Sequence, residues 1–338
     1  MSEQATPGGL SPVEISDRLE QALFEIRRVI AGQDQMLERV LVCLLAQGHL
    51  LIEGVPGLAK TLTIKTTAGV LGGSFSRVQF TPDLVPADLV GTRIYRPDQG
   101  TFDTELGPVF CNFLLADEIN RAPAKVQSAL LEVMQERQVT IAHHSHPVPS
   151  PFLVMATQNP IESEGTYPLP EAQVVRFMLK ILIDYPEHDE ELTIVQRQLV
   201  AAPDLRQALS LDELRTLQAA VFDVYVDPAL VSYAVQLATA TRRPADAGLA
   251  ELAAYVDFGA SPRGPISVIQ AARALALLRG RDYAITDDVH ALAKDALRHR
   301  LVLSYQALAE GMSADRILDA VLAAVPAPET SLARPTVS

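Results

Sequence analysis

The sequence contains no tryptophan, and aromatic residues make up only 5% of its 338 residues. Proteins that hold single-stranded nucleic acids stack the bases on aromatic side chains, which are scarce here. Basic residues are also in deficit, since 28 lysines and arginines face 41 acids and give a formal net charge of −13. Binding to nucleic-acid phosphates needs clustered positive charge. The composition therefore argues against non-specific nucleic-acid binding, although a local basic pore can exist within an acidic total.

Long apolar runs are absent as well. No run approaches the roughly 18–20 residues that cross a bilayer, so the sequence predicts no membrane span. Residues 1–9 lack the basic start and apolar core of a secretory signal. The only cysteines, Cys43 and Cys111, fall in segments predicted as helix and strand, where each serves as a small buried hydrophobe in a reducing compartment. We therefore expect a cytoplasmic protein.

The chain does contain a regular alternation of helix-like and strand-like segments. Helices are predicted over residues 13–31 and 33–47. The predicted strands cover residues 49–53, 75–80, 112–117, 152–158 and 177–184. Strands that alternate with helices form a parallel sheet covered on both faces. We therefore predict an α/β domain over residues 13–187.

Two insertions interrupt this alternation. Residues 92–104 and 138–150 each contain strand-like segments around a turn, which predicts two β-hairpins. The tip of the second contains His143, His144 and His146, and alternation places the last two on one face. These histidines form either a metal-binding pair or a solvated tip, since no third ligand of ordinary spacing is evident.

After residue 187 the pattern becomes helical only. Ser210 and Glu213 form a capping box ahead of an apolar run, and later Asp-Pro and Ser-Pro pairs mark further helix starts. We predict a helical second domain over residues 188–325. Residues 1–12 and 326–338 are rich in polar residues and proline, which predicts flexible tails.

One motif follows the first predicted strand. A glycine-bearing turn leads into Lys60 and Thr61, which open a helix. Backbone N–H groups of such a turn point at an anion, and the helix N-terminus adds its positive dipole. Lys60 would reach the β- and γ-phosphates of a nucleotide, and Thr61 would bind the accompanying Mg²⁺. Ala59 replaces the second glycine of the strict pattern, with the smallest side chain that can do so. The motif consists of Gly54, Val55, Pro56, Gly57, Leu58, Ala59, Lys60 and Thr61.

Two acids end the third predicted strand. Asp117 and Glu118 follow an apolar run, and open α/β sheets bind ligands at this edge of their strands. Asp117 would hold Mg²⁺ through its water shell, and Glu118 would polarise a water for attack on the γ-phosphorus. Taken alone, the first motif can be a chance Gly/Pro turn beside Lys-Thr, and the second can be an exposed acidic turn. Together the two motifs predict ATP and Mg²⁺ as ligands.

Four further residues are candidates for the same site. Asn159 follows the fourth predicted strand, where it either orients the attacking water or only makes a turn. Gln79 ends the second strand, where it could hydrogen-bond Glu118 and hold that base idle. Arg263, at a helix start of the second domain, is a candidate to reach back to the phosphates. Arg176 lies where it could reach a neighbouring subunit's nucleotide as an arginine finger. A surface salt bridge is the alternative for either arginine.

Several long strings in the chain together resemble the MoxR family of AAA+ ATPases. The likeness is dense over residues 25–190 and looser through the second domain. Ala59 is ordinary in that family. The strings that carry the resemblance cover residues 54–61, 79–92, 115–123, 127–140 and 156–172.

The resemblance implies an α/β nucleotide-binding domain with a C-terminal helical lid, assembled as a homo-oligomeric, hexameric ring. In such rings ATP lies between neighbours, which fits a role in trans for Arg176. Family members act as chaperone-like machines on protein clients, often together with a von Willebrand factor A-domain protein. Two departures concern Val175, where the family usually has an acid, and the hairpin tip, where histidines replace a Gly/Glu-rich sequence.

The leading interpretation is an ATP-hydrolysing, chaperone-like ring. One alternative is a motor subunit like that of magnesium chelatase. Another is a nucleic-acid-translocating motor, for which Arg93 and Arg96 would charge the first hairpin, while the second has no basic residue beyond its histidines. A third alternative, a nucleotide switch that rarely turns over, would have no need of Glu118.

Overall fold

The computed structural model describes residues 11–55, 60–98, 100–159, 167, 169–199 and 203–328. The chain separates into two compact units, one over residues 17–219 and one over the later residues together with residues 11–16. Residues 188–219 thus belong to the first unit, although the sequence pattern groups them with the later helices. The functional domain bounds of 13–187 and 188–325 stay predictions.

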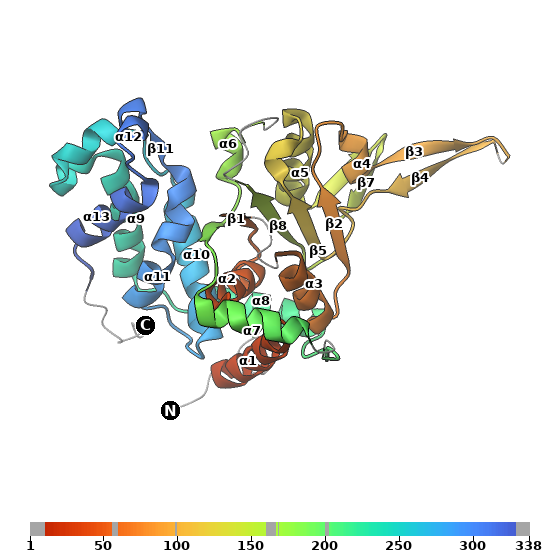
Figure 1. Cartoon of the computed structure of the whole chain (residues 1–338), viewed down its shortest axis with the longest axis horizontal. Helices are drawn as coiled ribbons and strands as arrows, with labels where there is room; N and C mark the ends of the chain where they lie inside the picture. The colour runs from red at the N-terminus through yellow and green to blue at the C-terminus, as the bar shows by residue number, and fades with distance from the viewer. Residues whose placement is uncertain are drawn as a thin grey trace, which may run out of the picture. The chain divides into compact units, whose positions relative to one another are not determined.

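A five-stranded parallel sheet forms the centre of the first unit (Figure 1). Its order is β2-β5-β8-β1-β9, and every neighbouring pair of strands is parallel. The strands are β1 (Leu50–Gly54), β2 (Phe75–Gln79), β5 (Phe113–Asp117), β8 (Leu153–Gln158) and β9 (Leu179–Ile183). The predicted α/β fold is confirmed, and each strand lies within or overlaps the segment predicted for it.

Both faces of the sheet are buried. On one face Leu114 and Val154 join a hydrophobic cluster with Val126 of α5. Leu115 and Met155 point to the opposite face and are fully buried too. Because both of their faces are buried, the central strands β1, β5 and β8 are largely apolar, whereas the edge strand β2 contains polar residues. The helices of this region are α1 (Pro12–Val29), α2 (Asp34–Leu45), α3 (Lys60–Val70), α4 (Pro86–Val90), α5 (Ala124–Glu136), α6 (Glu171–Val174), α7 (His188–Gln198) and α8 (Leu211–Asp223).

Both predicted hairpins are present. β3 (Gly91–Arg96) pairs antiparallel with β4 (Thr101–Leu106), and β6 (Gln138–Ile141) pairs with β7 (His144–Pro147). The β3–β4 ribbon extends away from the sheet (Figure 1), and every residue of β4 is exposed. The imidazole of His146 packs edge-on against Phe110 instead of joining a cluster of ligands. Within the described residues no group of three or more His, Cys, Asp or Glu side chains is arranged to hold a metal ion.

The second unit is mostly helical. Its longest helix, α10, is amphipathic and buries an alanine- and leucine-rich face. The prediction of helices alone missed one short antiparallel pair, β10 (Val256–Phe258) with β11 (Val302–Leu303), because such short segments show no periodicity. The helices are α9 (Pro228–Arg242), α10 (Arg263–Leu278), α11 (Thr286–Leu297), α12 (Tyr305–Ala309) and α13 (Ala314–Ala324), with 3₁₀ turns at Pro244–Ala247, Ala250–Tyr255 and Arg298–Arg300.

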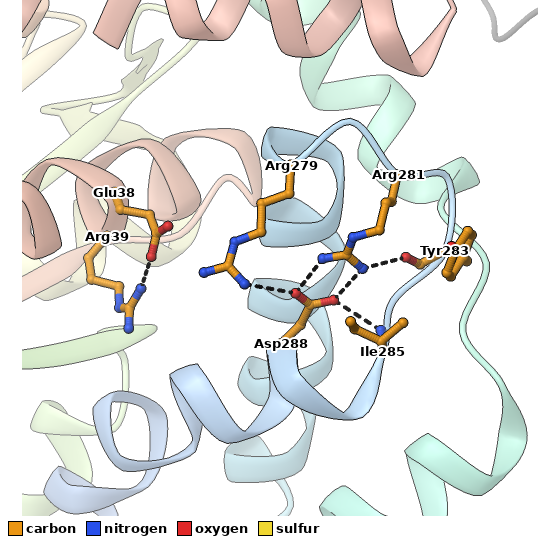
Figure 2. A network of polar contacts seen from close by, with 7 residues as sticks. All are labelled: Glu38, Arg39, Arg279, Arg281, Tyr283, Ile285 and Asp288. Carbon is orange, nitrogen blue, oxygen red and sulfur yellow. Dashed lines mark hydrogen bonds and ion pairs between the residues drawn. The ribbon is translucent and has the colours of Figure 1, made fainter. Parts of the chain in front are cut away.

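A buried ion pair closes the turn between α10 and α11. The carboxylate of Asp288 is fully buried and accepts hydrogen bonds from the guanidinium of Arg281 at 2.6 and 2.8 Å. It also accepts the backbone N–H of Ile285 at 3.0 Å, and Arg279 approaches it to 3.4 Å (Figure 2). The bond to Asp288 raises the pKa of Arg281. A buried carboxylate is tolerated only with such partners, so this cluster fixes the turn.

No helix in the described ranges is both long enough and apolar enough to cross a membrane.

Candidate nucleotide site

Polar side chains gather where three neighbouring strands end. β5, β8 and β1 are adjacent in the parallel sheet, so their carboxyl ends share one edge. Asp117 ends β5, Gln158 ends β8, and Gly54 ends β1 just before the loop that leads to α3. Ligands of open α/β sheets bind at this edge.

The structure describes the two ends, residues 54–55 and 60–61, of the motif from Gly54 to Thr61, which we call the phosphate-loop motif. Pro56, Gly57, Leu58 and Ala59 lie outside the described residues, whereas Val55 and Thr61 lie within them. A Cβ on Gly54 would lie 2.2 Å from the carbonyl oxygen of Ile183 on β9, so only glycine fits beside the neighbouring strand. The predicted helix opening is confirmed, because α3 begins at Lys60.

The ammonium group of Lys60 points back along the loop. Its Nζ donates a hydrogen bond of 2.8 Å to the carbonyl oxygen of Gly54. Burial lowers the pKa of Lys60, while the carboxylates of Asp117, Glu118 and Glu53 act in the opposite direction. Around Lys60 three carboxylates outnumber one ammonium. A nucleotide phosphate that bound here would therefore need a metal cation beside it to balance the negative charge.

A threonine hydroxyl joins the two acids. Thr157 of β8 donates from Oγ1 to Oδ1 of Asp117 at 2.6 Å and accepts the backbone N–H of Glu118 at 2.8 Å. One side chain therefore fixes both the orientation of the Asp117 carboxylate and the backbone that carries Glu118.

Glu118 has an unusual backbone conformation. Its φ of 55° lies in the left-handed region, which residues with a Cβ seldom adopt. This turn aims the side chain at the end of β2, where Oε2 accepts a hydrogen bond of 2.7 Å from Nε2 of Gln79. The predicted Gln79–Glu118 contact is confirmed. Arg121 also approaches Oε2 of Glu118 to 3.2 Å.

Arg77 links the two acids through a second route. Its Nη2 lies 2.7 Å and its Nε 3.2 Å from Oδ2 of Asp117, and Nη2 also donates to Oε1 of Gln79 at 3.0 Å. The sequence analysis missed Arg77, Thr157 and Arg121. A signal for Arg77 exists, since it lies two residues before Gln79 and therefore on the same face of the strand.

Three further predicted residues are Asn159, Arg176 and Arg263. Asn159 follows β8 directly and is half-buried. Arg176 donates from Nη1 to the carbonyl oxygen of Leu131 on α5 at 2.9 Å. Arg263 begins α10 in the other compact unit. A hollow of about 390 Å³ surrounds Arg176 and is lined by Ser128, Leu131, Glu132, Gln135, Glu136 and Gln173.

The oxygen donors at the sheet edge suit Mg²⁺. This ion binds protein sites through one or two carboxylates and keeps its other positions for water and substrate phosphates. Asp117, held in place by Thr157, would supply one carboxylate, and Thr61 in the first turn of α3 would supply a hydroxyl. Glu118 faces Gln79 and Arg121 instead, which leaves it available for a separate role.

The matches to family models follow this division of the chain. Residues 49–179 match the ATPase family associated with various cellular activities (AAA), and residues 250–321 match the AAA lid domain. The fold and the site therefore define a member of the AAA+ ATPases.

Individual relatives narrow the class. The chain is 56% identical to Chaperone MoxR1 of Mycobacterium tuberculosis, over 98% of this chain and 88% of that one. It is 30% identical to Protein MoxR of Methylorubrum extorquens, over 95% of this chain and 98% of the relative. The crystal structure of a candidate ATPase from Cytophaga hutchinsonii superimposes with a TM-score of 0.89 at 44% identity, covering 94% of this chain and 97% of that chain. The chain belongs to the MoxR family of AAA+ ATPases, as its motifs predict.

Proposed function

We propose that this protein hydrolyses Mg²⁺-ATP and uses the energy to remodel protein partners. The observation that carries the proposal is the convergence of Lys60, Asp117 and Glu118 at the carboxyl edge of the sheet. Phosphoryl transfer to water needs positioned charge and a placed base more than covalent help from the protein. These three groups provide a cation for the phosphates, a carboxylate for the metal and a base for the water.

Each residue of the site has a distinct role in this proposal. Gly54 to Thr61 wrap the phosphates, with Lys60 at the β- and γ-phosphates. Thr61 and Asp117 hold Mg²⁺, which when bound neutralises charge on the phosphates. Glu118 takes the proton of the attacking water, and Asn159 helps to orient that water. The bond that breaks joins the γ-phosphorus to the oxygen that bridges it to the β-phosphate.

Gln79 supplies a means of control. Its hydrogen bond of 2.7 Å holds the carboxylate of Glu118 toward β2. The same carboxylate oxygen also faces Arg121 at 3.2 Å, so Gln79 and Arg121 together hold the side chain in this orientation. We infer that Glu118 becomes an effective base when its side chain leaves Gln79.

Two arginines complete the proposed machinery. Arg176 lies against α5 with one nitrogen bound to Leu131, and its buried Nε has no hydrogen-bond partner among the residues that the structure describes. A guanidinium held at one end only can serve a neighbouring subunit, which supports the role of a finger in trans despite Val175. Arg263 is proposed to contact the phosphates of its own chain from the start of α10.

The name of one relative suggests the biological role. Chaperone MoxR1 shares 56% of its residues with this chain over nearly the whole length. We therefore propose a hexameric ring that acts on protein clients in the cytoplasm, with a von Willebrand factor A-domain protein as a candidate partner. No observation favours the chelatase-like or nucleic-acid-translocating alternatives.

Replacement of the base tests the proposal. Glu118→Gln should still bind ATP but release phosphate at least ~10²-fold more slowly, because a positioned general base typically contributes that much. Glu251→Gln, which changes an exposed acid of the second unit in the same way, is the matched control and should hydrolyse ATP normally. Phosphate release at the wild-type rate by Glu118→Gln would remove the assigned base and with it the proposed mechanism.

A further inference from the structure

The β3–β4 ribbon presents two chemically different faces. In its antiparallel register Tyr95 lies opposite Phe102, Arg93 opposite Thr104, and Gly91 opposite Leu106. Residues directly opposite each other share a face, and neighbours along a strand alternate between faces. These three pairs therefore occupy one face, which we call the aromatic face. It contains apolar side chains and one cation, and no acid.

The opposite face is polar. It carries the pairs Thr92–Glu105, Ile94–Asp103 and Arg96–Thr101. Its arginine is neutralised within the ribbon, because Nε of Arg96 lies 3.2 Å from Oδ2 of Asp103. Glu105 leaves this face with one excess negative charge, whereas the aromatic face carries one positive charge.

The aromatic face is open to solvent. Tyr95 is 51% exposed, Phe102 57% and Leu106 48%, although all three are large hydrophobic residues. The rings of Tyr95 and Phe102 contact each other across the ribbon, with ring centroids 5.0 Å apart. Apolar side chains arranged on a projecting ribbon in this way mark an interaction site more often than a structural core.

The cation of this face has no carboxylate beside it. The guanidinium of Arg93 lies 4.9 Å above the ring of Phe102, and no acid approaches it among the described residues. This contact fixes the positive charge between the aromatic pair and Leu106. A partner that pairs with it must bring a negative charge to the middle of the face.

We propose that the aromatic face binds an extended protein segment with the pattern apolar–x–acidic–x–apolar. In an extended chain every second side chain points the same way, so three such residues span about 13 Å, at ~3.3 Å per residue. Four residue steps along β4 from Phe102 to Leu106 cover the same length. One apolar side chain then packs on Tyr95 and Phe102, the acid pairs with Arg93, and the second apolar side chain meets Leu106.

This inference deepens the proposed function, because it names the chemistry of the client segment. Nucleic acid is a poorer occupant, since the face offers a single cation in a chain of net charge −13. A second copy of this chain is the other competitor, and the experiment below separates these sources.

The probe is a fluorescein-labelled peptide, Gly-Ser-Leu-Ser-Glu-Ser-Phe-Ser-Gly, and its counterpart with Lys in place of Glu. Binding to the full-length wild-type chain is measured by fluorescence anisotropy without nucleotide, so the readout does not depend on ATP hydrolysis. We expect the Glu peptide to bind about tenfold more tightly than the Lys peptide, because like charge at an interface is strongly unfavourable.

Two arginines on the same strand provide matched variants. Arg93→Glu and Arg96→Glu change the net charge equally but lie on opposite faces. Arg93→Glu should abolish the preference for the Glu peptide, whereas Arg96→Glu should retain it. Phe102→Ser should weaken binding of either peptide about tenfold, as loss of an aromatic anchor does. Circular dichroism of each variant checks the fold. Thr104→Glu keeps Arg93 but places an acid opposite it, so this variant should also lose the preference for the Glu peptide.

Several results would overturn the proposal. If Arg93→Glu and Arg96→Glu lose the preference for the Glu peptide equally, the attraction is general and not specific to the aromatic face. If the wild type shows no preference between the two peptides, Arg93 has no role in binding. Displacement of the peptide by single-stranded DNA would assign the face to nucleic acid. Loss of oligomers in Phe102→Ser, seen by sedimentation, would assign it to a second copy. None of these results bears on whether Glu118 is the catalytic base, so the two proposals fail separately.

Discussion

Two clusters of this molecule use the same chemistry in opposite ways. In each, an aspartate accepts hydrogen bonds from an arginine and from at least one further donor. Asp288 is fully buried, and the Arg281 side chain beside it is 19% exposed. Asp117 is 18% exposed, and its partner Arg77 is 48% exposed. The first pair cannot exchange its partners without a large cost, whereas the second can.

The surroundings of the two aspartates sharpen this difference. The carboxylate of Asp288 has three partners, which are Arg279, Arg281 and the backbone N–H of Ile285. Its negative charge is therefore balanced within the turn. At the sheet edge a second acid, Glu118, lies beside Asp117 and close to Lys60. Burial and the number of partners, and not the residue types, separate this structural cluster from the proposed nucleotide site.

The largest effect is expected from Arg281→Gln. It leaves the Asp288 carboxylate buried without its main partner, which costs about 3–5 kcal/mol of unfolding free energy. Urea denaturation followed by circular dichroism measures this loss. A change under about 1 kcal/mol would show that the buried cluster is as replaceable as a surface pair.

A buried histidine supplies an intermediate effect that depends on pH. His49 lies between Met134, whose carbonyl is 3.1 Å from Nε2, and Val154, whose N–H donates to Nδ1 at 3.0 Å. Burial lowers its pKa to about 3, so the folded state binds fewer protons than the unfolded state below the ordinary value of 6.5. Stability should therefore fall as the pH falls below 6.5, by up to ~1.4 kcal/mol per pH unit from this group.

The variant His49→Gln isolates this contribution. Its unfolding free energy should decline less steeply than that of the wild type between pH 6.5 and pH 4. His188→Gln, which alters an exposed histidine, should keep the wild-type slope. Identical slopes in the wild type and His49→Gln would show that His49 is not held neutral.

The smallest effect on stability is expected from Arg77→Gln. Because the Arg77 side chain is about half exposed, its pair with Asp117 contributes at most ~1 kcal/mol. A cation at Asp117 competes with Mg²⁺ for the same carboxylate, so the variant should need up to about fivefold less Mg²⁺ for half-maximal ATP hydrolysis. A magnesium titration of phosphate release checks this shift. A loss of stability as large as that of Arg281→Gln would erase the contrast between the two clusters.

The sequence predicts the part of the site that depends on strand ends. Gln79 and Asp117 end neighbouring parallel strands in matching register, so side chains at these ends meet. Strand assignment therefore predicts that Gln79 lies beside the two acids, whereas its hydrogen bond to Glu118 also depends on the turn after β5.

Other features depend on details that no local pattern encodes. The left-handed φ of Glu118 follows from the turn after β5 and the hydroxyl of Thr157. Arg77 looks like an ordinary edge-strand arginine until its pairing with Asp117 is seen. The strand pair formed by β10 and β11 is too short to show alternation. In each case the missing information is tertiary.

Calorimetric titration of a slowly hydrolysed ATP analogue in the presence of magnesium tests the central claim most directly. The wild-type chain should bind one nucleotide per subunit, and Lys60→Ala should show no binding heat, because in the proposed site the ammonium beside Asp117 and Glu118 holds the phosphates. Equal binding by the wild type and Lys60→Ala, or no binding by either, would contradict the assignment of this sheet edge as the nucleotide site.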